Sequence, residues 1–180
     1  MIELFSEIPY LSDGYIELKR LEESDAPFLE RFIADERIYK YLPTFLFEQK
    51  FDDMKKMIRE LYGDYFRRKD SLILGIYLNE GNVLCGLAEF YGYKASLQKT
   101  CIGYRLSPEF WGRDIATRAV KLVTDYLFSK TDIEIITAST MIENKASARV
   151  LEKNGFIRTS SGVPEDWGFE EPTLADKWFR

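Results

Sequence analysis

The segment from Thr100 to Leu127 constrains the fold more than any other part of this 180-residue chain. It predicts a strand over 100–107, a turn over SPEFWGRD, and a helix whose apolar residues recur at helical spacing. A helix that starts directly after such a turn has unpaired N–H groups at the positive end of its dipole. The segment therefore predicts a helix packed on a sheet, with an anion-binding site at the helix start.

Period-2 and period-3.6 segments alternate along the rest of the chain, without a linker or an internal repeat. Ser24 or Asp25 is expected to cap the first helix, with Pro27 in its first turn. Asn154-Gly155 is expected to close the last helix. The pattern predicts one α/β domain over residues 1–180, with strands at 14–21, 71–78, 82–93, 133–140, 156–160 and 173–180 and helices at 24–38, 51–69 and 144–156.

Composition narrows the functional classes. The chain is 46% hydrophobic and 31% charged, with a formal net charge of -5, so nothing indicates a nucleic-acid or anionic-membrane partner. No apolar run is long enough to span a membrane, and the first residues do not resemble a signal peptide, so a cytoplasmic protein is expected. With two cysteines and no histidine, no metal site is expected.

The absence of histidine also limits the chemistry. Neither a Ser-His-Asp nor a Cys-His arrangement can form within the chain. Any general base must be a carboxylate, a tyrosinate, a neutral amine or a water molecule held by polar groups.

Four motifs follow one another along the chain: YIELKRL (15–21), CGLAEF (85–90), IGYRLSPEFWGRDIAT (102–117) and NKASARVLEKNGF (144–156). In this order they resemble the GNAT superfamily of acetyl-CoA-dependent N-acetyltransferases, in particular the branch with the Rim-type ribosomal-protein N-terminal and spermidine acetyltransferases. The resemblance covers residues 14–179. It implies an α/β (α+β) GNAT fold, in which about four helices flank a mixed, mostly antiparallel, twisted sheet of about seven strands.

The same resemblance implies that acetyl-CoA is the co-substrate. The Leu106 N–H would meet the thioester oxygen, and strand IGYRLS would pair with the pantetheine arm. Arg113 and Arg118 would add positive charge near the pyrophosphate. The alternative is an ordinary loop before an amphipathic helix. Backbone N–H groups of the turn would hold the pyrophosphate, namely those of Trp111, Gly112, Arg113, Asp114, Ile115, Ala116 and Thr117.

Asp114 departs from the family pattern, which usually has glycine at this position so that the backbone can approach the phosphates. We expect its carboxylate to turn outward, where it would cap the N–H of Ala116 or Thr117 or pair with Arg113 or Arg118. The turn would then still bind CoA, with modestly reduced affinity.

Two residues of the last helix are candidate catalytic groups by the resemblance. Asn144 would hold the pantetheine or the acceptor, and Ser147 would protonate the departing thiolate. The alternative is structural, because Asn144 is a good N-cap and Ser147 occupies the third helical position. Many GNAT enzymes have a tyrosine where this chain has Leu151, so Ser147 or a water molecule must replace it.

Glu89 is the candidate proton acceptor for the amine, and a solvent-facing strand glutamate is the alternative. If strands 82–93 and 100–107 form a simple hairpin, paired positions sum to 193 and Glu89 lies opposite Tyr104. In this register Cys85 and Cys101 lie on the order of 20 Å apart, so we expect two reduced, largely buried thiols.

The acceptor is expected to be a primary amine, with a protein N-terminal α-amine favoured and a polyamine or other small amine as alternative. The aromatic run over 39–47 and the loop over 162–172 would form its walls. In that loop four acidic residues would favour a cationic acceptor: Glu165, Asp166, Glu170 and Glu171. The alternative is a solvated hairpin, and three basic residues lie near the aromatic run: Arg37, Lys40 and Lys50. A CoA-binding but inactive GNAT module stays open, as does a nucleotide-binding module, although the chain lacks GxxxxGK[ST] and GxGxxG. A monomer or a homodimer is expected.

Overall fold

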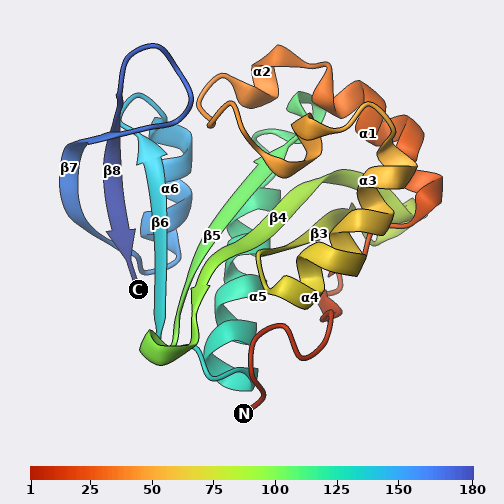
Figure 1. Cartoon of the computed structure of the whole chain (residues 1–180), viewed down its shortest axis with the longest axis horizontal. Helices are drawn as coiled ribbons and strands as arrows, with labels where there is room; N and C mark the ends of the chain where they lie inside the picture. Colours follow the sequence, from red (N-terminus) through yellow and green to blue (C-terminus); the bar gives the residue numbers. More distant parts are fainter.

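A computed structural model describes residues 1–180, which form an eight-stranded sheet flanked by helices on both faces (Figure 1). The strand order is β1-β2-β3-β4-β5-β6-β8-β7, and only β5 and β6 are parallel. This confirms the expected mixed, mostly antiparallel sheet, with one additional short strand, β1. The strands are β1 (Leu11–Ser12), β2 (Ile16–Lys19), β3 (Ser71–Leu78), β4 (Val83–Lys94), β5 (Lys99–Leu106), β6 (Ile135–Met141), β7 (Ile157–Glu165) and β8 (Thr173–Phe179).

Two expected helices are divided into shorter pieces. The helix expected over 24–38 is interrupted at Asp35, whose side chain caps the second piece, and Pro27 lies in the first turn as expected. The helix expected over 51–69 contains a π turn with a non-helical Gly63. The α-helices are α1 (Ala26–Ile33), α2 (Glu36–Tyr39), α3 (Met54–Glu60), α4 (Phe66–Arg68), α5 (Ile115–Lys130) and α6 (Lys145–Lys153). The shorter turns are η1 (Glu23–Asp25), η2 (Phe47–Lys50), the π turn η3 (Leu61–Tyr65), η4 (Glu80–Asn82), η5 (Ala95–Leu97) and η6 (Pro108–Phe110).

The two faces of the sheet have separate hydrophobic cores. Side chains of α5 and α6 pack with Leu72 and Leu74 of β3 on one face. Side chains of α1 and α3 pack with Ile73 of the same strand on the other face. Because successive side chains of a strand point to opposite faces, the continuous apolar run of β3 is buried on both sides.

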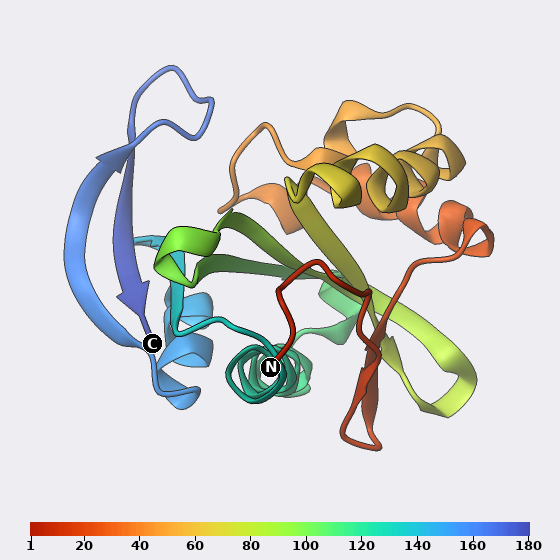
Figure 2. The same ribbon diagram turned by 60° about the horizontal axis from the view of Figure 1, so that its bottom comes forward.

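The sheet splits between β5 and β6. These strands pair over three positions only, from Lys99 opposite Ile135 to Cys101 opposite Thr137, and then diverge (Figure 1). Figure 2 shows β7, β8 and α6 on one side of the gap and α1 to α4 on the other. A cleft of about 1770 Å³ is lined by residues from both sides of the gap.

The expected register of β4 and β5 is wrong by one residue. Lys94 pairs with Lys99, as positions that sum to 193 should, but a bulge between Tyr91 and Lys94 shifts all later pairs. Glu89 consequently lies opposite Gly103, and Tyr104 lies opposite Ala88. Since a one-residue shift moves a side chain to the other face, Glu89 and Tyr104 point to opposite faces of the sheet.

Neither cysteine forms a disulfide. Cys85 is buried and Cys101, which lies opposite Tyr91, is only partly buried. Two free thiols were expected, although Cys101 is more accessible than predicted. No helix has the length and apolar character needed to cross a membrane.

Candidate active site

The turn before α5 has the geometry of an anion site. Gly112 and Asp114 both have left-handed backbone conformations, with φ of 71° and 60°. The Trp111 N–H donates to the Pro108 carbonyl at 3.1 Å, so it is engaged in the preceding turn. The N–H groups of residues 112–117 have no acceptor within the protein, and the first helical bond runs from the Arg118 N–H to the Asp114 carbonyl at 3.1 Å. Six adjacent free N–H groups at a helix start fit a pyrophosphate.

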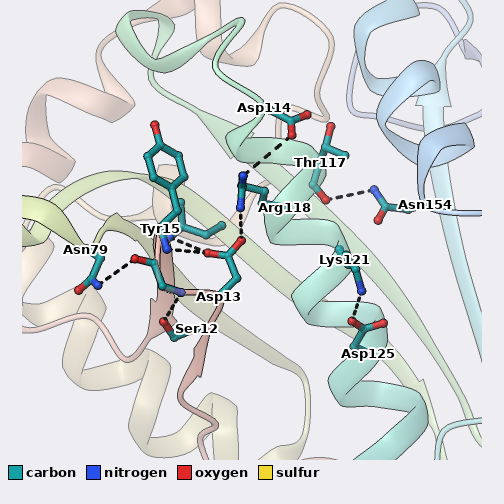
Figure 3. A network of polar contacts seen from close by, with 12 residues as sticks. Ser12, Asp13, Tyr15, Asn79, Asp114, Thr117, Arg118, Lys121, Asp125 and Asn154 are labelled. Carbon is teal, nitrogen blue, oxygen red and sulfur yellow. Dashed lines mark hydrogen bonds and ion pairs between the residues drawn. The ribbon is translucent and has the colours of Figure 1, made fainter.

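The Asp114 side chain is turned outward, as expected. It is 55% exposed and lies 4.0 Å from both Arg118 and Lys153, but it caps no N–H of α5, so the capping role is wrong. Figure 3 shows Arg118 between Asp114 and Asp13, and its shorter contact, 2.7 Å, is to Asp13. Arg118 is thus partly neutralised. Arg113 lies over the Phe110 ring instead.

Leu106 lies at the cleft edge of β5. The Ser107 N–H donates to the Cys85 carbonyl on β4 at 2.9 Å, and N–H directions alternate along a strand. The Leu106 N–H and carbonyl therefore point away from β4, toward the cleft. The Trp111 indole donates to that carbonyl at 2.9 Å, which fixes the start of the turn against the strand.

Asn144 and Ser147 lie at the start of α6 and line the cleft. The Asn144 side-chain oxygen accepts the Ser147 N–H at 3.2 Å, so the capping role is present. The Ser147 hydroxyl lies 2.7 Å from the Tyr104 hydroxyl, which comes from β5. Burial raises the pKa of Tyr104, so this phenol stays protonated, and its O–H donates to the Ser147 carbonyl at 3.2 Å. Leu151 is fully buried in the core.

Glu89 is buried, with 8% of its surface exposed, and lines the other part of the cleft. Its Oε1 accepts the Ser71 hydroxyl at 2.7 Å and its Oε2 accepts Nη1 of Arg105 at 3.0 Å. The alternative of a solvent-facing glutamate is therefore wrong. The Arg105 pairing was not expected.

Arg105 joins Glu89 to a second carboxylate. Its Nε and Nη2 each donate to Glu48 at 2.6 Å, and the Tyr39 hydroxyl donates to Glu48 at 3.1 Å. Burial alone would lower the pKa of Arg105, but the Glu48 and Glu89 carboxylates raise it above its ordinary value. Burial and Glu48 raise the pKa of Tyr39. Glu48 is 0% exposed and does not line the cleft.

The expected acceptor walls meet at the cleft. The Thr44 N–H donates to the Trp167 carbonyl at 2.9 Å, which joins the aromatic segment to the 162–172 loop. Two of the four acidic residues, Glu170 and Glu171, do not line the cleft, and Glu165 is ion-paired with Lys177. The opposite wall carries three basic residues: Arg37, Lys40 and Lys50. The expected acidic lining is therefore only half present: Glu165 and Asp166 line the cleft, and Glu170 and Glu171 do not.

Sequence reasoning missed Glu48, Arg105 and the contact between Tyr104 and Ser147. The IGYRL motif contained Tyr104 and Arg105, and a correct register would have placed Arg105 diagonally across from Glu89. No local signal pointed to Glu48, which lies 57 residues from Arg105.

Comparisons with known proteins identify the family. The profile of the acetyltransferase (GNAT) domain family matches residues 16–157, so the chain belongs to the GNAT acetyltransferases, enzymes that use acetyl-CoA as co-substrate. The probable N-acetyltransferase YjcK of Bacillus subtilis is 34% identical over 106 residues, and the match spans 58% of each protein. The uncharacterized N-acetyltransferase YoaA of Bacillus subtilis is 24% identical over 93% of each protein.

Solved structures show the same fold. A GNAT-family acetyltransferase from Bacillus anthracis superimposes with a TM-score of 0.81 at 20% identity, covering 96% of this chain and 98% of that one. RimL, a ribosomal L7/L12 α-N-protein acetyltransferase in complex with coenzyme A, gives 0.79 at 18% identity and 97% coverage of both chains. Spermidine N-acetyltransferase from Vibrio cholerae, in complex with CoA and spermine, gives 0.76 at 18% identity, covering 93% of this chain and 96% of that one.

Proposed function

We propose that this protein transfers an acetyl group from acetyl-CoA to a primary amine, with a protein N-terminal α-amine as the favoured acceptor. One observation carries the proposal: a single cleft contains a free N–H cradle, the Leu106 edge, the Ser147 hydroxyl and a buried carboxylate, Glu89. These groups correspond to the needs of acyl transfer to an amine, namely an anion anchor, an oxyanion donor, an acid and a proton acceptor.

Binding of the co-substrate is assigned to the α5 start and to β5. N–H groups of residues 112–117 would hold the pyrophosphate, and the Leu106 N–H would donate to the thioester oxygen as negative charge develops there. Acetyl-CoA supplies the activated acetyl group. Asn144 would keep the start of α6 in place beside the pantetheine arm.

Proton transfers are assigned to Glu89 and Ser147. Glu89 would accept the proton of the attacking amine through water. Ser147 would donate its proton to the departing thiolate, and the Tyr104 hydroxyl, 2.7 Å away, would turn its proton from the Ser147 carbonyl to the oxygen left behind. Solvent would then return a proton to Ser147 and take the proton held by Glu89. Acetylated amine and free CoA are the products.

The pKa of the acceptor amine decides how strong a proton acceptor the reaction needs. An α-amino group with a pKa of about 8 is neutral roughly one time in ten at pH 7, whereas a lysine amine is neutral about once in a few thousand. The α-amine is therefore the easier acceptor for a water relay. A polyamine is disfavoured by the three basic residues on one wall and by the pairing of Glu165 with Lys177.

A panel of amines tests the proposal. Release of free CoA thiol would be followed with N-terminal peptides, polyamines, aminoglycosides and amino acids as acceptors. Turnover of N-terminal peptides above the other amines is expected, and preferred turnover of polyamines would reassign the acceptor. CoA binding without turnover of any amine would favour the inactive module, which Asp114 and Leu151 make the second candidate.

A further inference from the structure

The cluster of Arg105, Glu48 and Glu89 carries an imbalance of charge. Both carboxylates are ion-paired with Arg105, and each also accepts one hydroxyl: Glu48 that of Tyr39, and Glu89 that of Ser71. One guanidinium stands against two carboxylates. The cluster therefore has one excess negative charge in a buried position.

The excess charge is not shared equally between the two carboxylates. Glu48 receives two short bonds from Arg105, both 2.6 Å, in the bidentate geometry that binds carboxylates best. Glu89 receives one longer bond of 3.0 Å. Glu89 is thus the less compensated carboxylate, and it is also the one that lines the cleft, whereas Glu48 does not reach it.

A buried charge without a full counter-charge is costly and favours a cationic ligand. We propose that Arg105, Glu48 and Glu89 form the subsite that binds the acceptor amine as an ammonium ion, which rests on the proposed function. Glu48 acts as a positioning residue: by engaging most of the Arg105 charge, it leaves the Glu89 carboxylate available to the ammonium group. Specificity for a cationic head group then depends on a residue that never touches the acceptor.

Binding in a dead-end complex tests this inference without turnover. Calorimetry at pH 6.5 with saturating CoA would compare Ala-Ala-Ala amide with lactyl-Ala-Ala amide, in which a neutral hydroxyl replaces the ammonium group. The α-amine, with a pKa of about 8, is cationic at this pH. The wild type should bind the ammonium peptide at least about tenfold more tightly than the hydroxyl peptide, since a buried carboxylate discriminates charge strongly.

Two variants remove the excess charge from different positions. Glu48→Gln leaves Arg105 to neutralise Glu89, and Glu89→Gln removes the carboxylate that lines the cleft. Both should reduce the discrimination ratio to below about threefold with CoA affinity unchanged, whereas Glu48→Asp, which keeps the charge, should retain it. Glu170→Gln is the matched control, because it removes one carboxylate on the acceptor loop that lies outside the cleft.

The outcomes separate this inference from the proposed function. A wild type that binds both peptides equally or binds neither overturns the inference, as does an unchanged ratio in folded Glu48→Gln or Glu89→Gln. Should Glu48→Gln fail to fold, Glu89→Gln decides alone, because it acts on the same charge. Preference for the ammonium peptide without acetylation of any amine would support the subsite and refute the proposed transfer.

Discussion

Replacing Asp114 by glycine tests why this chain has a carboxylate at the edge of its anion site. Asp114 has φ of 60° and ψ of 10°, a left-handed conformation that glycine adopts without strain and that aspartate tolerates better than most residues. Glycine would relieve about 1 kcal/mol of strain, but it also gives the unfolded chain about 0.5–1 kcal/mol of extra conformational freedom. The two terms nearly cancel, so Tm should move by less than about 3 °C.

The effect on CoA affinity comes from charge. An exposed carboxylate repels a phosphate bound beside it by on the order of 1 kcal/mol when the interaction is screened by water. Arg118 and Lys153, each 4.0 Å from the carboxylate, offset part of this. Asp114→Gly should therefore tighten binding of acetyl-CoA by less than about tenfold, or 1.4 kcal/mol.

The assay is calorimetric titration with CoA at low and high salt. Asp114→Asn should give most of the gain, because asparagine also tolerates the left-handed conformation and lacks the charge. Asp125→Asn is the matched control: it removes an exposed carboxylate that pairs with Lys121 on α5, about 15 Å further along the helix (Figure 3). The gain should shrink at high salt. If the wild type bound no CoA and Asp114→Gly restored binding, the carboxylate would block the site and the inactive module would be the better account.

Three further predictions concern single residues. Ser147→Ala should lower kcat by about 10²–10⁴-fold with CoA affinity nearly intact. Tyr104→Phe should lower kcat less, with a deficit that shrinks as the pH rises above the pKa of the CoA thiol, where the thiolate needs no proton. A wild-type rate in Ser147→Ala would leave only its structural role. Arg105→Met should reduce the free energy of unfolding, measured in urea, by about 3–5 kcal/mol, because two carboxylates lose their counter-charge. Arg67→Met, which removes one partner of an exposed ion pair, should reduce it by less than about 1 kcal/mol. Equal losses in the two variants would contradict the reasoning. Burial raises the pKa of the Cys85 thiol to about 11, so in native protein at pH 8 it should react with Ellman's reagent at least about 100-fold more slowly than after unfolding. The unfolded thiol ionises first as pH rises, so this group should contribute to a loss of stability between about pH 9 and 11, and fast native labelling of Cys85 would show that it is not buried.

The local sequence pattern was sufficient to predict most helices and strands. The apolar run over 71–78 predicted both ends of β3 correctly. A strand buried on both faces is apolar along its whole length, so it can be recognised without knowing its neighbouring strands. A capping role was the structural alternative for Asn144, and Gly155 was predicted as part of a C-terminal closure; both are seen, since capping depends on neighbouring residues only. The helix predicted over 24–38 was too long, because apolar periodicity does not reveal that the Asp35 side chain caps a second, separate helix.

The sequence by itself therefore determined the family and the order of most elements, which depend on short-range pattern. Anion binding by the turn over 111–117 stays a prediction. Tertiary structure alone decided which side chains meet. The bulge between Tyr91 and Lys94 moved Glu89 onto the face of Arg105 and Tyr104 onto the face of Ser147. A strand register is fixed by the sum of many distant contacts, and a shift of one residue exchanges the two faces, so no local signal could have placed Glu48 against Arg105.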